Sequence, residues 1–418
     1  MSEGMSLNKT PSANRTHIVF IGKMNSGKSS LINALAGQEI SIVSDIMGTT
    51  TDAVKKPMEI HGIGPCVLID TAGFDDSTEL GVKRVEMTKK AASGADIAVI
   101  LLGGTDLEQE KRWYQYFVNM NTPVITVINK CDETDNEDEI VAEAERQMDI
   151  VPVRTSVLQR KGIEELKNKL VEAVSVSKEK RFITGNLVSE EDLVLLVMPQ
   201  DIQAPEGRLI LPQVQTIREL LDKKCLVMSV TTDKLEAALK VMTVPPKLII
   251  TDSQVYKTVY SMKPEESLIT SFSTLFAAYK GDIRYYVESA ETLAGLTEDS
   301  KVLIAECCTH APLAEDIGRE KIPALLRKRV GQGLKVDIVS GTDFPDNLKE
   351  YDLVIQCGAC MFNRKYVMSR IESAKLQNVP VTNYGVAIAW LNGILDKVTL
   401  PEQEVRNGYE TGGYCHNS

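Results

Sequence analysis

The feature that most constrains the fold is the segment GKMNSGKS at residues 22–29, which lies between an apolar run at 16–21 and an amphipathic run that continues to residue 36. It fits the pattern G-x-x-x-x-G-K-[ST], in which backbone N–H groups bind phosphate, the lysine neutralises its charge and the hydroxyl binds Mg²⁺. A strand, a glycine-containing loop and a helix in this order are what such a loop requires. The sequence therefore predicts a P-loop domain with these phosphate and Mg²⁺ contacts: Gly22, Asn25, Ser26, Gly27, Lys28, Ser29 and Ser30, with Lys28 also catalytic and Ser29 also a Mg²⁺ ligand.

Two further motifs follow apolar runs later in the chain. Asp70-Thr-Ala-Gly73 comes directly after residues 67–69, and Asn129-Lys-Cys-Asp132 comes directly after residues 124–128. Asp70 is placed to hold Mg²⁺ through water. Because ligands bind at the carboxyl ends of the strands in an open α/β sheet, three motifs that each end a strand predict one nucleotide site.

The alternation of strand and helix patterns predicts the fold class. Strand patterns alternate with amphipathic helix patterns throughout the chain, which indicates α/β structure with mainly parallel sheets. We expect three successive α/β domains, the first a P-loop domain with a mainly parallel sheet. The expected divisions are a flexible N-terminal tail at 1–15, the P-loop domain at 16–175, a middle domain at 182–262 and a third domain at 263–418.

Composition limits the classes of partner. The 418 residues carry 47 Lys plus Arg against 58 Asp plus Glu, a net charge of −11, so the chain lacks the positive field that general nucleic-acid binding requires. No apolar run approaches the length of a membrane span, and the first residues have no apolar signal-peptide core. We expect a folded protein in the cytoplasm, with neither nucleic acid nor a membrane as partner.

The cysteines of the third block are the second chemical feature. Cys307-Cys308-Thr-His310 and Cys357-Gly-Ala-Cys360 each follow a short apolar run. If both runs are strands of one parallel sheet, these side chains emerge at the same edge. Three cysteines and a nearby histidine fit either a Cys3His zinc site or a three-cysteine [4Fe–4S] site with one open iron. We expect Cys307 to be a buried structural thiol.

Residues 17–175 resemble GTPases of the translation-factor-related class, and most closely the TrmE and Era group. The resemblance rests on the P-loop, on Asp70 to Gly73 and on Asn129 to Asp132. It implies that Asp132 accepts from the nitrogen donors of guanine, which excludes adenine. For the base, it implies that Asn129 and Asp132 recognise guanine, that Lys130 packs on the ring, and that Ser156 and Val157 give backbone contacts. For Mg²⁺, it implies that Thr50, in the segment GTTTD at 48–52, is a ligand. The catalytic residues that it implies are Lys28, Thr50, Asp70 and Gly73.

Two residues bear on the rate of hydrolysis. Phe74 stands where a Ras-like enzyme has its water-positioning glutamine, so we expect slow intrinsic hydrolysis. In the TrmE-like group, an asparagine at the P-loop position of Asn25 accompanies a bound K⁺ ion that acts in place of an arginine finger. We therefore expect K⁺ to stimulate GTP hydrolysis, the alternative being that Asn25 is an ordinary loop residue.

The whole chain resembles the HydF family, the GTPases of [FeFe]-hydrogenase maturation. Besides the GTPase motifs, the resemblance rests on GRLILPQVQTI at 207–217, SFSTLF at 271–276, YKG at 279–281 and the cysteine pattern. It implies a [4Fe–4S] cluster on Cys308, Cys357 and Cys360 with an exchangeable fourth ligand. It also implies a scaffold or carrier for the two-iron subcluster, which dimerises through the middle domain, with a tetramer as a further form. The implied partners are the radical-SAM maturases HydE and HydG and the apo-[FeFe]-hydrogenase.

Two questions stay open at this stage. The fourth cluster ligand is His310, Glu306 or an external ligand, and Gln356 stands where the family usually has a histidine before its second cysteine pair. The alternative function is a regulatory or RNA/ribosome-assembly GTPase of the Era and TrmE group with a structural zinc domain. That alternative predicts a basic C-terminal module, against which the acidic composition argues.

Overall fold

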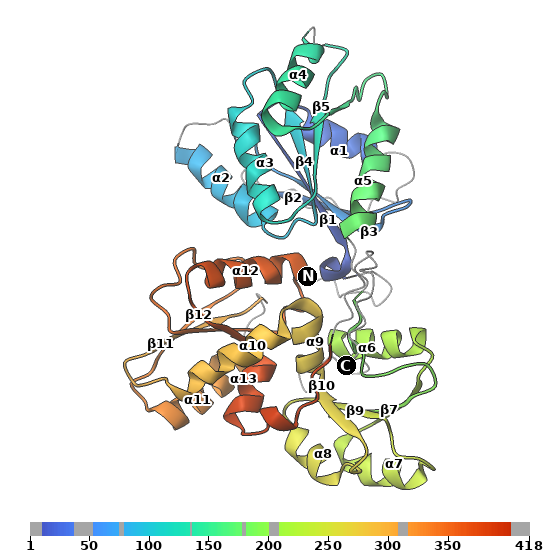
Figure 1. Cartoon of the computed structure of the whole chain (residues 1–418), viewed down its shortest axis with the longest axis vertical. Coiled ribbons are helices and arrows are strands. Elements are labelled where there is room, and N and C mark those ends of the chain that lie inside the picture. The colour runs from blue at the N-terminus through green and yellow to red at the C-terminus, as the bar shows by residue number, and fades with distance from the viewer. Residues whose placement is uncertain are drawn as a thin grey trace, which may run out of the picture. The chain divides into compact units, whose positions relative to one another are not determined.

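The computed structural model describes residues 11–36, 53–74, 79–133, 136–177, 181–199, 209–307 and 317–402. The chain divides into two compact units, of which the first comprises Met1–Lys178 with Met361–Ser369 and the second comprises Glu179–Cys360 with Arg370–Ser418. Each unit is described by itself (Figure 1). Among the helices of the described ranges, none combines the length and apolar character needed to cross a membrane.

The first unit is built on a six-stranded sheet with strand order β2-β3-β1-β4-β5-β6. Every neighbouring pair is parallel except β2 and β3, which form an antiparallel hairpin. The strands are β1 (Thr16–Gly22), β2 (Val54–Ile60), β3 (Gly64–Asp70), β4 (Ile97–Leu102), β5 (Val124–Ile128) and β6 (Val153–Arg154). The helices are α1 (Lys28–Ala36), α2 (Glu79–Ala92), α3 (Glu108–Asn119), α4 (Glu137–Met148) and α5 (Ile163–Ser177), and a short 3-10 helix, η1 (Ser12–Asn14), precedes β1.

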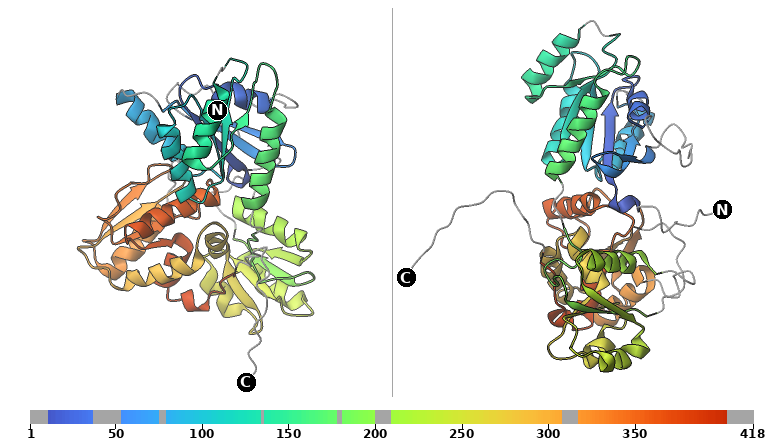
Figure 2. Two further views of the ribbon diagram at one scale, coloured as in Figure 1. Left: turned by 45° about the horizontal axis from the view of Figure 1, so that its top comes forward. Right: turned by 90° about the vertical axis from the view of Figure 1, so that its right-hand side faces the viewer.

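Helices cover both faces of this sheet (Figures 1 and 2). On one face, Leu31 of α1 and Leu166 of α5 are fully buried against β1, β3 and β4. On the other face, Phe117 of α3 and Ala144 of α4 are fully buried in a second core. Because the central strands are covered on both faces, their sequences are continuous apolar runs. The expected P-loop domain with a mainly parallel sheet is confirmed.

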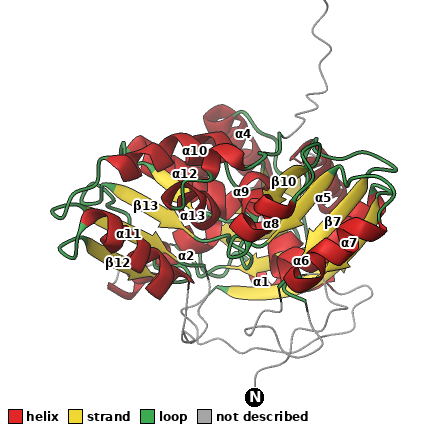
Figure 3. Ribbon diagram, turned by 90° about the horizontal axis from the view of Figure 1, so that it is seen from below, coloured by secondary structure: helices red, strands yellow, loops and turns green. Residues whose placement is uncertain are grey.

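The second unit contains two four-stranded parallel sheets, with strand orders β10-β9-β7-β8 and β12-β11-β13-β14. Helices α9 and α13 lie between the two sheets (Figure 3). The strands are β7 (Leu193–Val197), β8 (Leu226–Val230), β9 (Leu248–Thr251), β10 (Leu268–Ser271), β11 (Lys301–Ala305), β12 (Lys335–Val339), β13 (Leu353–Gln356) and β14 (Val381–Asn383). The helices are α6 (Leu211–Asp222), α7 (Leu235–Val241), α8 (Tyr256–Met262), α9 (Phe272–Lys280), α10 (Ile283–Ala290), α11 (Ile322–Val330) and α13 (Tyr384–Leu391), together with the part of α12 (Arg364–Leu376) that begins at Arg370; the residues of α12 before Arg370 are assigned to the first unit. Shorter helices are η2 (Thr232–Lys234), η3 (Glu291–Ala294), the π-helix η4 (Ile317–Lys321) and η5 (Leu395–Lys397).

The expected division between residues 262 and 263 falls inside the middle sheet. Strand β10 pairs with β9 in the register Leu268↔Leu248, and α9 then buries Leu275 against the same sheet. A four-residue apolar run gives no local signal of which sheet it joins, because that depends on tertiary pairing. At the N-terminus, part of the expected tail is ordered, since Ala13 in η1 is buried.

Candidate functional site

The P-loop wraps tightly around the side chain of Lys28. The ammonium group of Lys28 donates to the carbonyl oxygens of Gly22, at 2.9 Å, and Lys23, at 2.8 Å, and the residue is only 7% exposed. Gly27 has φ +87°, and a Cβ at this position would collide with the side-chain amide of Asn129. Asn25 also lies in the left-handed region, with φ +59°. A glycine at 27 is therefore required by the close approach of a second motif.

The Mg²⁺ side of the site is formed by two adjacent strand ends. Phe20 of β1 and Asp70 of β3 stand side by side in the parallel register. The hydroxyl of Ser29 donates to Oδ2 of Asp70 at 2.5 Å, so the two expected metal contacts are brought together. Gly73 is half-buried immediately beyond. Thr50, expected as a further Mg²⁺ ligand, lies outside the described residues.

The guanine side follows β5 and β6. The amide of Asn129 donates to the carbonyl of Ser26 at 3.2 Å, and its oxygen accepts from the Thr155 hydroxyl at 3.0 Å. Asp132 is half-buried and Lys130 has φ +62°. The remaining contacts that were expected here also follow β6: Ser156, which is buried, and Val157, which is half-buried. The sheet thus brings the described residues of all three motifs to one edge.

Helix α3 connects to this site through two residues that sequence analysis did not select. Glu110 is fully buried, and its Oε1 lies 3.3 Å from Nζ of Lys23 in the P-loop. Burial raises the pKa of Glu110, and Lys23 opposes that shift. Trp113 lies against Phe74, with ring centroids 6.5 Å apart. Phe74 is therefore part of an aromatic core. The burial of Glu110 could not be predicted from the sequence, because Glu110 lies in an otherwise polar helical stretch.

The second pair of cysteines follows β13 at the carboxyl edge of the third sheet. Cys357 and Cys360 are half-buried, and Cys307, just beyond β11, is buried as expected. Sγ of Cys357 accepts from the backbone N–H groups of Cys307, at 3.1 Å, and Ala359, at 3.4 Å. Hydrogen bonding from the Cys307 side chain holds the pKa of Cys357 below its ordinary value. Cys307 therefore lies beside the expected ligands.

The other two expected ligands cannot be placed. Cys308 and His310 lie outside the described residues. Within the ranges that are described, no three Cys, His, Asp or Glu side chains form a group that could hold a metal ion. The metal assignment to Cys308, Cys357, Cys360 and His310 therefore stays a proposal.

Lys280, at the end of α9, fixes the loop between the two cysteines. Its ammonium group donates to the carbonyl of Ala359 at 2.7 Å and approaches that of Cys360 at 3.4 Å. Lys280 is 3% exposed, and burial lowers its pKa to about 8, against the opposing effect of the nearby cysteine side chains. Asn383, which caps α13, donates to the carbonyl of Cys357 at 3.2 Å. Both ends of the loop are thus held by side chains from other elements.

Glu306, an alternative fourth cluster ligand, and Gln356, which stands where the family usually has a histidine, both have other partners. Gln356 is buried, and its amide donates to the hydroxyl of Tyr286 in α10, so it faces the core. Oε2 of Glu306 accepts from the guanidinium of Arg319 at 3.0 Å and from the hydroxyl of Ser340 at 3.2 Å. These contacts oppose a ligand role for Glu306.

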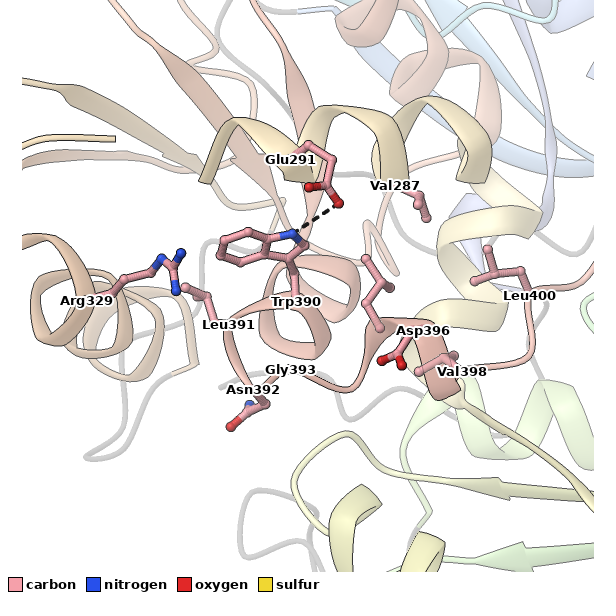
Figure 4. A pocket seen from close by; sticks show the side chains of 11 residues that line it. Val287, Glu291, Arg329, Trp390, Leu391, Asn392, Gly393, Asp396, Val398 and Leu400 are labelled. Carbon is pink, nitrogen blue, oxygen red and sulfur yellow. Dashed lines mark hydrogen bonds between the residues drawn. The ribbon is translucent and has the colours of Figure 1, made fainter. Parts of the chain in front are cut away.

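A pocket of about 820 Å³ shares none of its lining residues with the two sites described above, and its side chains are drawn in Figure 4. Its polar groups already interact with one another. The indole N–H of Trp390 donates to Glu291 at 3.2 Å, and the guanidinium of Arg329 lies 4.5 Å from the centroid of the Trp390 ring. This pocket presents neither a cysteine nor a histidine among its lining residues.

Comparison with known families agrees with this geometry. Residues 17–130 match the family model described as a 50S ribosome-binding GTPase. Together with the P-loop and the Asn129 motif, the match defines the first unit as a GTPase. Residues 183–281 match the hydrogen maturase F dimerization domain, and residues 284–401 match the hydrogen maturase F tetramerization domain. The chain belongs to the hydrogen maturase F (HydF) family.

Two curated relatives are each similar to less than two fifths of this chain. GTPase Der of Campylobacter fetus is 42% identical over 124 residues, which is 29% of this chain and 26% of that protein. The tRNA modification GTPase MnmE of Mannheimia succiniciproducens is 35% identical over 164 residues, which is 38% of this chain and 35% of that protein. The chain therefore spans about a quarter to a third of these relatives. A crystal structure of Era from Aquifex aeolicus is 18% identical with a TM-score of 0.32, covering 60% of this chain and 99% of that one.

Proposed function

We propose that the protein is a GTP-hydrolysing scaffold that carries a [4Fe–4S] cluster and delivers the two-iron subcluster to [FeFe]-hydrogenase. The observation that supports the proposal is the combination, in one chain, of a GTPase family match with two HydF domain matches that together cover more than half of the residues. The proposed division keeps the three expected domains, a GTPase, a dimerisation and a cluster-binding domain, but places the boundary between the last two after α9. The protein acts as a homodimer or homotetramer in the cytoplasm.

The GTPase residues have separate roles in this proposal. Lys28 neutralises the outer phosphates of GTP, Ser29 and Thr50 ligate Mg²⁺, and Asp70 holds it through water. The N–H of Gly73 senses the γ-phosphate. Hydrolysis is slow, because Phe74 is turned into the aromatic core and cannot orient water. K⁺ bound near Asn25 supplies the positive charge that an arginine finger would otherwise provide.

The cysteine site fits an anionic iron–sulfur cluster. Cys308, Cys357 and Cys360 would hold it, with His310 as the candidate fourth ligand. N–H groups directed at Sγ of Cys357 and the buried ammonium group of Lys280 favour negative charge there. When bound, a cluster with one open iron supplies a coordination position that can bridge a second metal centre. The protein residues would hold the thiolates in position, at a loop where Cys357 and Cys360 are half-buried.

The nucleotide state regulates association with partners and does no chemistry on the cluster. This follows from the switch logic of GTPases, in which loops held by the γ-phosphate are released on hydrolysis. The partners are the radical-SAM maturases HydE and HydG, which build the two-iron subcluster, and apo-[FeFe]-hydrogenase, which receives it. Equal affinity for these partners with GTP, with GDP and without nucleotide would contradict the regulatory role.

The proposed scaffold function is tested by measuring transfer of the two-iron subcluster to apo-[FeFe]-hydrogenase. The protein is produced together with HydE and HydG, purified without oxygen and incubated with apo-[FeFe]-hydrogenase, and hydrogen evolution is measured. We expect wild type to activate the hydrogenase and the Cys357→Ala variant to give no activation. Cys225→Ala removes a buried thiol in the middle sheet and is the matched control, which should activate like wild type. Activation by Cys357→Ala at the wild-type level would refute the scaffold function.

A further inference from the structure

Lys280 lies at the meeting point of the two HydF domain matches. It is the last residue of α9, in the part of the chain that matches the dimerization domain, and its ammonium group contacts the Cys357–Cys360 loop, which matches the tetramerization domain. Both segments belong to the second compact unit. The middle domain thus supplies a side chain to the edge of the cysteine site.

The loop that Lys280 contacts has an unusual backbone. Ala359 is buried and has φ +51°, in the left-handed region that disfavours a residue with a side chain. The Lys280 ammonium donates to the carbonyl of this same residue, at 2.7 Å. An alanine in that conformation persists only when surrounding contacts determine it, and the buried hydrogen bond from Lys280 is such a contact.

The lysine is held in position by its neighbours. Gly281 follows it, and a Cβ on Gly281 would collide with the ring of Tyr286, so the helix must end there in a glycine. Tyr279, on the other side, packs edge-to-face on Phe276 with centroids 6.0 Å apart. The segment Tyr279-Lys-Gly281 therefore directs one long cationic side chain at the loop while its flanking residues lock the end of α9.

We propose that Lys280 is a positioning residue of the metal site, which holds the Cys357–Cys360 loop in its ligand-binding conformation and places a buried positive charge beside the thiolates. This inference rests on the proposed iron–sulfur site. A cation beside a cluster stabilises its more negative, reduced form, because opposite charges attract and the Lys280 ammonium group is itself buried. Loss of a residue that orients metal ligands typically weakens metal binding by about 10- to 100-fold.

The test compares three full-length variants after anaerobic reconstitution with iron and sulfide. Lys280→Met removes the charge and the hydrogen bond, Lys280→Arg keeps a cation, and Lys349→Met removes one exposed charge in the loop that leads to the opposite end of β13. We expect Lys280→Met to release iron to a chelator at least about tenfold faster and to have a more negative midpoint potential in an EPR-monitored titration. Lys280→Arg should have a midpoint potential close to that of wild type. Lys349→Met should match wild type in both midpoint potential and rate of iron release.

A second measurement needs no cluster. In the metal-free protein, hydrogen exchange at the backbone amides of residues 357–360 should be faster in Lys280→Met than in wild type, while exchange in β13 stays the same. Unchanged exchange together with an unchanged potential and iron-release rate would overturn the role of Lys280. If wild type binds no cluster, the proposed function fails, and the exchange experiment alone decides whether Lys280 positions the loop. Circular dichroism of each variant establishes that it is folded.

Discussion

Lys23 in the P-loop and Glu110 in α3 form an ion pair with 3.3 Å between Nζ and Oε1, and Glu110 has no exposed surface. The same lysine donates to the carbonyl of Asp106 at 2.7 Å. One turn further along α3, Trp113 packs on Phe74, the residue after the Asp70 motif. Helix α3 is therefore connected to both loops that surround the phosphates of a bound nucleotide.

The Lys23–Glu110 pair should support nucleotide binding. We expect Glu110→Gln to weaken binding of fluorescent GDP by about three- to tenfold, because Lys23 loses the charge that fixes the start of the P-loop. Glu108→Gln, which removes an exposed carboxylate on the same helix, is the matched control and should bind like wild type. Equal affinity of the Glu110 and Glu108 variants would show that the ion pair does not position the P-loop.

The stability effect of Glu110 has a defined pH dependence. Burial raises its pKa in the folded protein, so the folded state binds its proton more tightly than the unfolded state. The contribution of Glu110 to stability is therefore greatest below its unfolded pKa and is lost as pH rises through the raised value. We expect the unfolding free energy of Glu110→Gln relative to wild type to increase as pH rises from below the ordinary pKa of glutamate through the raised pKa of Glu110. Urea denaturation monitored by Trp113 fluorescence, in a Trp390→Phe background, measures this; a difference independent of pH would contradict it.

Asp132 should determine the preference for guanine. We expect Asp132→Asn to reduce GTP affinity by at least about 100-fold, since the carboxylate accepts from two nitrogen donors on the base. The same variant should gain affinity for xanthosine triphosphate, whose base presents an oxygen where guanine presents an amino group. Glu139→Gln, which removes an exposed carboxylate in α4, is the control. Competition binding against labelled GDP distinguishes these outcomes, and unaltered base preference in Asp132→Asn would refute the role.

Asn25 offers a clean test of K⁺ stimulation. Its φ of +59° would be strained in an alanine, so Asn25→Gly removes the amide without straining the backbone. We expect wild type to hydrolyse GTP faster in K⁺ than in Na⁺ buffer, and Asn25→Gly to hydrolyse at one slow rate in both. Equal wild-type rates in the two buffers would exclude a role for K⁺.

Phe74 should matter for stability and not for positioning water. It is 7% exposed against Trp113, so Phe74→Ala leaves a cavity and should cost about 3 kcal/mol of unfolding free energy in the first unit. Phe74→Leu fills most of that volume and should cost less than about half as much. Phe74→Gln should not accelerate GTP hydrolysis, because the side chain at this position lies in the aromatic core. A faster Gln variant would show that position 74 faces the attacking water.

Much of the GTPase site could be predicted because its motifs are local. Gly22 to Ser29, Asp70 and Asn129 each end a strand, and parallel pairing then brings them to one edge. Each of these residue types is also required by the chemistry of phosphate, metal or base. Sequence patterns of this kind predict both where a residue lies in the fold and which role it has in the site.

The features that were missed depend on long-range packing. Glu110 has the pattern of an exposed helical acid, and only the approach of the P-loop shows why it is buried. Lys280 has the pattern of a cation at a helix C-terminus, and its contact with Ala359 joins residues 79 positions apart. The boundary expected after residue 262 was misplaced for the same reason, since β10 is assigned to the middle sheet by its pairing with β9.

EPR spectroscopy of the reduced protein, after anaerobic reconstitution with iron and sulfide, decides whether the cysteine site holds an iron–sulfur cluster. We expect a brown protein with an S = 1/2 cluster signal that is lost when Cys308, Cys357 and Cys360 are all replaced by alanine. A colourless protein that retains stoichiometric zinc through the same anaerobic preparation would contradict the claim and leave a GTPase with a structural metal domain.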